Sequence, residues 1–190
     1  MKLSTSGIEI RRISLPRIVW LLIATVMFWH LLFVRLSEPS RTYVIGSDGA
    51  GYYAYLPAAF IYHDLEFKFC QLGQPTKIES SGADHTLFMN RTIEGKLVNK
   101  YFFGTAILES PFFFIAYGTA SWFGYPPNGY SFPFQCAVAL AAIFYVLLGL
   151  DQLRKLLLKK GMSESVTALT MLLIFLGTNL YHYASAEPSM

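Results

Sequence analysis

The chain has 190 residues, of which 54% are hydrophobic and only 14% are charged, whereas an ordinary soluble chain has roughly 25% charged residues. Its mean hydropathy of +0.41 excludes a disordered chain and argues against a soluble globular domain. The net charge of +3 is small and scattered, so no nucleic-acid partner is expected, and two cysteines cannot build a disulfide framework or a zinc site. The composition predicts an all-α integral membrane protein whose partners include membrane lipid.

Three apolar stretches are long enough to cross a bilayer, which takes about 20 residues of helix. They predict transmembrane helices at 18–36, 132–151 and 164–186. The first is interpreted as an uncleaved signal anchor, because no small-residue cleavage site follows it.

A fourth apolar stretch, at 101–123, contains Glu109 and Pro111. Proline lacks the N–H that a helix interior needs, so Pro111 is expected to start a new helix rather than continue one. The remainder, to residue 123, would be only about 20 Å long, against about 30 Å for a bilayer core. We therefore predict an interfacial helix near 101–123. Glu109 is either buried against a cation such as Lys100 or exposed to water.

Two clusters of basic residues predict the topology, because such clusters favour the cytoplasmic side. One precedes the first predicted span and the other follows the second: Lys2, Arg11, Arg12 and Arg17, then Arg154, Lys155, Lys159 and Lys160. The predicted order is a cytoplasmic N-terminus (1–17), the first span, an outer periplasmic loop (37–131), the second span, a basic cytoplasmic turn (152–163), the third span, and an outer-face end (187–190) where we expect truncation. The expected location is the bacterial inner membrane.

The outer loop begins with short amphipathic helices, predicted near 47–66 and broken near Pro57. Ser47 is expected to cap the first of them. Asp48 would then lie in its first turn, where a negative charge suits the helix dipole. Residues 71–96 are polar and rich in turn formers, so they are expected to be exposed.

Four side chains of the outer face are candidates for chemistry. Asp48 lies among glycines that would let a substrate approach the backbone, although it equally suits a helix N-terminus. Lys100 lies at the start of the predicted interfacial stretch. It is either a cation that binds a lipid phosphate or a lysine that extends to the headgroups as an anchor. Glu187, before a proline, is a second carboxylate or a solvated helix end. His182, one turn earlier, is an auxiliary group or a packing residue.

This order of elements resembles the N-terminal portion of the GT-C membrane glycosyltransferases, closest to the bacterial aminoarabinose transferase and protein O-mannosyltransferase type. The resemblance runs from about residue 18 to the last residue. It aligns the acid of the family's first outer loop with Asp48, and Gly49 stands where the family has a second acid. A Glu-Lys pair of the family corresponds to Asn99 and Lys100, which precede Tyr101. The family's acid-Pro pair corresponds to Glu187 and the proline after it.

The resemblance implies a partial GT-C fold and the inverting transfer of a sugar from a polyprenyl-phosphate donor to a lipid, protein or glycan acceptor on the outer face. It assigns Asp48 and Glu187 as catalytic carboxylates and Lys100 as the ligand of the donor phosphate. Asn99, Tyr101 and His182 would be auxiliary. It leaves a divalent metal open. Such a fragment is expected to be inactive alone, because three spans and one loop can hardly enclose both substrates.

Two hypotheses that assign the protein to other functional classes remain. One is a small, non-catalytic multi-pass scaffold or assembly protein, in which Asp48, Lys100 and Glu187 are dispensable. The other is a truncated transporter, which the lack of charge near mid-bilayer disfavours. Convergence of the three residues around one outer-face cleft would favour the transferase, and scattered positions would favour the scaffold.

Overall fold

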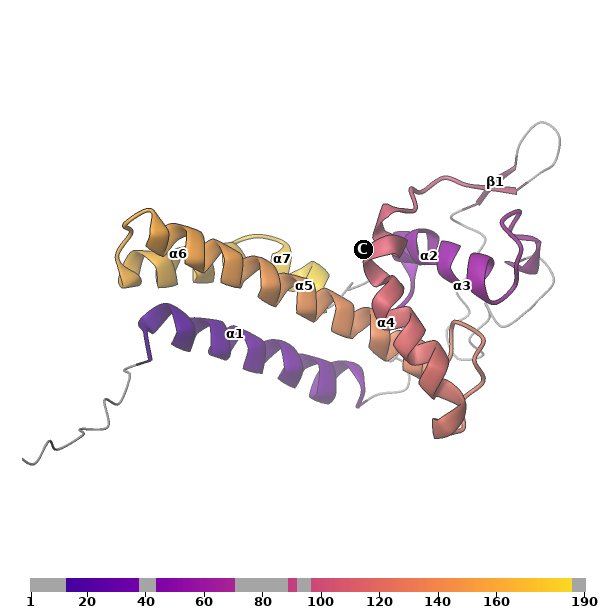
Figure 1. Ribbon diagram of the computed structural model, residues 1–190, viewed down its shortest axis with the longest axis horizontal. Helices are drawn as coiled ribbons and strands as arrows, with labels where there is room; N and C mark the ends of the chain where they lie inside the picture. The colour runs from indigo at the N-terminus through magenta and orange to yellow at the C-terminus, as the bar shows by residue number, and fades with distance from the viewer. Residues whose placement is uncertain (1–12, 38–43, 71–88, 92–96, 186–190) are drawn as a thin grey trace, which may run out of the picture.

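The computed structural model describes residues 13–37, 44–70, 89–91 and 97–185, and these are mostly helical, as predicted (Figure 1). The larger elements are, in chain order, α1 (Leu15–His30), α2 (Ser47–Tyr53), α3 (Tyr55–Phe60), β1 (Met89–Arg91), β2 (Leu97–Asn99), α4 (Gly104–Ala120), α5 (Phe132–Lys159), α6 (Glu164–Gly177) and α7 (Leu180–Ser185). Single π or 3₁₀ turns lie at Leu31–Arg35, Lys68–Cys70 and Ser121–Phe123.

The long helices α1, α5 and α6 pack side by side as a bundle. Two segments, Leu15–Arg35 and Phe132–Lys159, are long and apolar enough to span a membrane. A hydrogen bond from the Trp20 indole N–H to the Leu147 carbonyl joins them, at 2.9 Å. Large apolar side chains such as Leu22 and Leu173 are exposed on the outside of the bundle. These outward faces are what a helix in contact with lipid presents.

The third predicted span is not one helix. α6 ends at Gly177, and Thr178 takes an extended backbone conformation. The Thr178 hydroxyl donates to the Ile174 carbonyl at 2.7 Å and accepts from the Leu180 N–H at 3.2 Å, so it ends α6 and begins α7. The prediction of a continuous helix over 164–186 was therefore wrong, because this local side-chain bonding interrupts an otherwise apolar stretch.

The predicted turn at 152–163 is mostly helix, since α5 continues to Lys159. The chain then reverses tightly. The Met162 N–H donates to the Leu157 carbonyl at 3.1 Å, and Gly161 has the left-handed φ of +82° that this C-terminal motif requires. Ser163 caps α6 by accepting from the Val166 N–H.

Pro111 lies inside α4 and does not start a new helix, contrary to expectation. A proline at this position removes the donor that the Ile107 carbonyl would use. The Ser110 hydroxyl donates to that carbonyl instead, at 2.7 Å. α4 therefore runs as one helix from Gly104, and Figure 1 shows it lying across one end of α5.

The short helices predicted near 47–66 also begin at slightly different residues than expected. Gly46, not Ser47, is the N-cap of α2, and Asp48 lies in the first turn as expected. The break falls at Ala54 rather than near Pro57, because Pro57 occupies the first turn of α3, where a missing N–H costs little.

A small antiparallel ribbon, which sequence reasoning did not predict, leads into α4. β1 and β2 pair with Asn90 opposite Val98. Because β2 ends at Asn99, the ribbon delivers the segment 99–101 to one side of α2.

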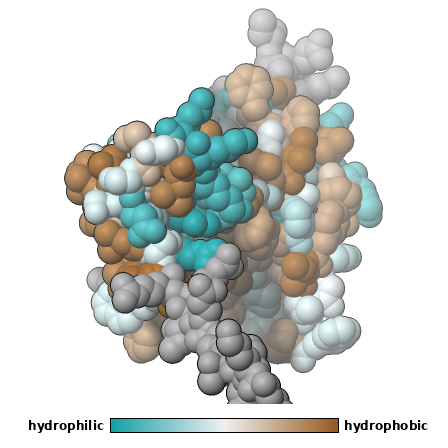
Figure 2. Space-filling model, turned by 60° about the vertical axis from the view of Figure 1, so that its left-hand side comes forward, coloured by the Kyte–Doolittle hydropathy of each residue, from teal (hydrophilic) through white to brown (hydrophobic). Residues whose placement is uncertain are grey.

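The molecule has two distinct ends (Figure 1). The turn end comprises the start of α1, the end of α5 and the start of α6, where the Leu15 N–H donates to Glu164 at 3.1 Å. The loop end comprises α2, α3, α4 and the β1–β2 ribbon. Figure 2 turns the left-hand end of Figure 1 forward and shows hydrophilic residues gathered there, with hydrophobic residues exposed around them.

Candidate functional site at the loop end

The loop end brings Asp48 and Tyr101 together, although they are 53 positions apart in the chain. The Tyr101 hydroxyl donates to Asp48 Oδ1. Asp48 is exposed in the first turn of α2, which aims the carboxylate at solvent. The hydrogen bond to Asp48 raises the pKa of Tyr101 above its ordinary value, because it favours the protonated phenol.

Lys100 adds a cation to the same patch. Its Nζ lies 5.0 Å from the centroid of the Tyr101 ring. The Tyr52 ring lies on Tyr101 as well, with ring centroids 4.7 Å apart. A carboxylate, a phenol and an ammonium group thus meet on one aromatic platform that is open to solvent. We call this set, Asp48, Lys100 and Tyr101, the loop-end patch.

Asn99 is buried and holds the patch in position. Its Nδ2 donates to the Gly51 carbonyl at 2.7 Å, and its Oδ1 accepts from the Tyr101 N–H at 3.0 Å. The Tyr55 hydroxyl donates to the Tyr101 carbonyl at 2.6 Å. These bonds tie the segment after β2 to the two short helices, so Asn99 acts as a positioning residue.

Gln135 anchors the chain that leads into α2, and sequence reasoning missed it. The side chain is buried, and its Oε1 accepts from the N–H groups of Val44 and Ile45 at 2.7 and 2.8 Å. Its Nε2 donates to the Tyr130 carbonyl at 2.9 Å. The available signal was a glutamine inside the otherwise apolar start of the predicted span at 132–151, since a buried amide needs partners.

A second anchor lies at the turn that precedes α5. Tyr53, fully buried, donates to the Gly129 carbonyl at 2.5 Å. Gly129 has a φ of +84°, and a Cβ there would lie 2.8 Å from the Pro57 Cβ, so only glycine fits. The loop end is therefore fixed both to α5, through Gln135, and to the turn before it, through Tyr53.

Glu109 is neither paired with Lys100 nor exposed to water. It is 5% exposed, and among the described residues its Oε2 has no hydrogen-bond partner. It borders a cavity of about 230 Å³ between α4, α5 and α7, next to Tyr145 and Tyr183. Burial raises the pKa of Glu109 to about 8, because an apolar site disfavours the charged form.

The two remaining candidates do not join the patch in the described part of the chain. Glu187 lies outside the described residues. His182 is exposed on α7, which packs chiefly on α5 and α6, and its ring contacts Tyr183. The end of α7 is also bonded to the turn after α1, because Arg35 donates to the carbonyl of Ser185 at 3.2 Å.

No group of three His, Cys, Asp or Glu side chains able to hold a metal occurs among the residues that the structure describes. The patch offers one carboxylate and one ammonium group, which suits proton transfer and anion binding. Comparison with known proteins found no matching family model, no matching curated protein and no matching solved structure.

Proposed function

We propose that this chain is the N-terminal segment of a membrane glycosyltransferase that transfers a sugar, with inversion, from a polyprenyl-phosphate donor to an acceptor on the outer face. One observation carries the proposal: Asp48, Tyr101 and Lys100 form a single exposed patch at the end of the bundle opposite Arg17 and Arg154. Two of the three residues whose convergence favours a transferase over a scaffold thus share one patch.

In the proposed reaction, Asp48 is the general base. Its carboxylate takes the proton of the acceptor hydroxyl while that oxygen bonds to the anomeric carbon of the sugar. The bond between the anomeric carbon and the phosphate oxygen breaks, and its electron pair leaves with the phosphate. Lys100 stabilises the charge that develops on this leaving group. Because Tyr101 binds Oδ1, we assign the other carboxylate oxygen to the acceptor proton.

The proposed topology has three crossings, with the N-terminus in the cytoplasm of a bacterial inner membrane. Arg17 and Arg154 border one groove at the turn end, which supports a common side for both basic clusters. At 1.5 Å per residue α6 and α7 are about 21 Å and 9 Å long, which together equal a core of about 30 Å. This topology predicts that a membrane-impermeant maleimide added from outside labels Lys68→Cys and does not label Lys159→Cys. Each substitution is made in a variant without other cysteines.

The transferase proposal is tested on the protein that the complete gene encodes. Membranes carrying it receive a polyprenyl-phosphate donor with a radiolabelled sugar, and transfer to lipid, protein and glycan fractions is counted. Asp48→Asn should lower transfer by about 100-fold or more, and Lys100→Gln should lower kcat/KM for the donor, because it removes the charge that stabilises the leaving phosphate. Glu66→Gln and Lys68→Gln remove like charges at the same end and should leave both values unchanged. Transfer at the wild-type rate in Asp48→Asn would refute the base assignment.

The second candidate is a non-catalytic scaffold, and one observation favours it. The Asp48 carboxylate already accepts a hydrogen bond from Tyr101, which is what a carboxylate with a purely structural role at the start of a helix would do. A scaffold predicts no transfer by the wild-type protein. It also predicts that Asp48→Asn leaves copurifying partners unchanged, because Asp48 is dispensable for a scaffold.

A further inference from the structure

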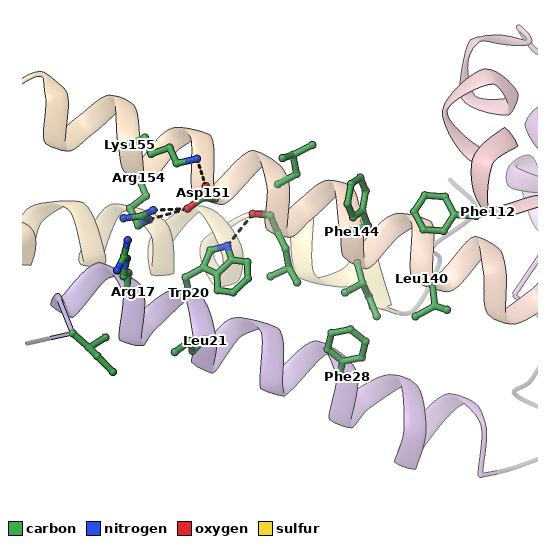
Figure 3. Close-up of a pocket in the computed structure, with 14 residues that line it drawn as sticks. Arg17, Trp20, Leu21, Phe28, Phe112, Leu140, Phe144, Asp151, Arg154 and Lys155 are labelled. Atoms are coloured by element: carbon green, nitrogen blue, oxygen red, sulfur yellow. Dashed lines mark hydrogen bonds and ion pairs between the residues drawn. The ribbon is translucent and has the colours of Figure 1, made fainter. Parts of the chain in front are cut away.

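A long groove between α1 and α5 begins at the turn end and lies outside the loop-end patch. Its volume is about 960 Å³, within the range of small-molecule sites. Figure 3 shows Leu21, Phe28, Leu140 and Phe144 along its walls and the charged side chains gathered at one extremity. The groove is thus charged at one end and apolar along the rest of its length.

The charged extremity carries an excess of positive charge. Asp151 forms ion pairs with Arg154 at 2.6 Å and with Lys155 at 2.7 Å. Arg17 reaches the same place from α1 and makes no ion pair within the described residues (Figure 3). Three cations and one carboxylate leave a local charge of +2, which complements a phosphate or another anionic headgroup.

The apolar part has the length of one membrane leaflet. Arg17 and Phe28 are eleven positions apart on α1, which corresponds to about 16 Å of helix. A bilayer core is about 30 Å thick, so this is roughly half of it. An acyl chain whose headgroup lies at Arg17 would follow the groove towards Phe28.

The shape of the lining favours a lipid over another helix. Helix pairs in membranes approach closely through small residues such as glycine, alanine and serine. The residues that line the groove include none of these and are bulky or charged, such as Trp20, Leu21, Phe28 and Phe144. A flexible chain fills the space between such side chains better than a rigid cylinder.

We infer that the groove between α1 and α5 binds an anionic phospholipid, with its phosphate at Arg17, Arg154 and Lys155 and one acyl chain along Leu21 and Phe28. The inference rests on the proposed topology, which sets the turn end at the cytoplasmic leaflet, and not on the glycosyl transfer. The bound lipid would lie between α1 and α5 beside the hydrogen bond from Trp20 to the Leu147 carbonyl.

Trp20 borders the groove and reports on its occupant. The experiment uses the full chain with Trp29→Phe and Trp122→Phe, reconstituted in phosphatidylcholine vesicles. Brominated phosphatidylglycerol or brominated phosphatidylcholine is added at equal fractions, and quenching of Trp20 fluorescence is measured. We expect stronger quenching by the anionic lipid. Arg17→Gln and Lys155→Gln should each lower this preference about fivefold, because each removes a direct contact to the bound phosphate, worth about 1 kcal/mol.

Lys159→Gln is the matched control, because Lys159 is an exposed cation one turn beyond Lys155 and does not border the groove. It should keep the preference, and so should Asp48→Asn. Equal quenching by both lipids, or an equal loss in Lys159→Gln, would overturn the inference. So would weak quenching by both lipids together with protection from aqueous iodide, which means that protein covers the groove. Quenching by iodide alone would instead refute the membrane topology.

Discussion

The loop end and the turn end hold their charged groups in different ways. At the loop end, Asp48 and Tyr101 come from segments 53 positions apart, and side-chain bonds to the backbone from Asn99 and Gln135 keep those segments in place. At the turn end, Asp151 pairs with residues three and four positions later on the same helix. The first arrangement depends on tertiary contacts, whereas the second follows from helix geometry.

The two ends should therefore differ in how they respond to substitution. A buried amide that serves several backbone groups is difficult to replace, so one substitution at the loop end should disturb the whole patch. A pair on one helix surface has neighbours that take over, so the turn end should tolerate change. Four experiments test this contrast.

The largest effect is expected for Gln135→Ala. It leaves two buried N–H groups, those of Val44 and Ile45, without an acceptor, and each costs roughly 1–3 kcal/mol. We expect a loss of about 4 kcal/mol in the free energy of unfolding, measured by denaturant titration in detergent. Gln152→Ala changes an exposed glutamine of the same helix and should cost little. Equal losses in both variants would show that Gln135 is no anchor.

Glu109→Gln should remove a pH dependence of stability. The folded pKa is raised to about 8 from an ordinary 4.5, so between these values the folded protein keeps a proton that the unfolded chain loses. Stability is therefore full below about pH 4.5 and declines until about pH 8. The variant should be more stable than the wild type above pH 8, because it has no carboxylate to charge in the buried site. Thermal unfolding at a series of pH values checks this.

The control for that series is Glu164→Gln, which alters an exposed carboxyl group at the turn end. It should keep the decline between pH 4.5 and pH 8. A wild-type protein whose stability is level over this interval would contradict the assigned burial of Glu109.

Ser163→Ala tests the turn end directly. It removes the acceptor for the Val166 N–H at the start of α6. The loss should be about 1 kcal/mol, the usual cost of a helix cap, and thus well below that of Gln135→Ala. Ser163→Thr keeps the hydroxyl and should retain most of the stability. A loss larger than that of Gln135→Ala would reverse the proposed contrast between the two ends.

The smallest effect concerns the exposed patch itself. Asp48→Asn should lower the pKa of Tyr101 towards its ordinary value, because the carboxylate that raises it is gone. Carbon-13 tyrosine NMR measures this titration, with the Tyr101 signal assigned through Tyr101→Phe. Glu164→Gln, at the other end, should leave it unchanged. An unaltered titration in Asp48→Asn would show that the two side chains do not meet in solution.

Several features could be predicted from residues alone because their causes are local. The apolar stretches before Arg35 and after Phe132 are long enough to cross a membrane whatever their neighbours do. The first-turn position of Asp48 followed from small and polar residues before an aromatic run. The break at Thr178 and the continuation through Pro111 were missed, since each depends on one hydroxyl that bonds to a nearby carbonyl.

The helical class and the two long apolar helices follow from the residues alone, and so does the separation of Arg17 and Arg154 from Asp48 and Lys100, because hydropathy and charge act along the chain. Tertiary packing was needed to show that Tyr101 binds Asp48 and that Asn99 and Gln135 hold their segments in place. It was also needed to show that Glu109 is buried, with no partner for Oε2 among the described residues. Those facts depend on which backbone groups lie opposite a side chain after packing. A pattern of residue types does not contain that information.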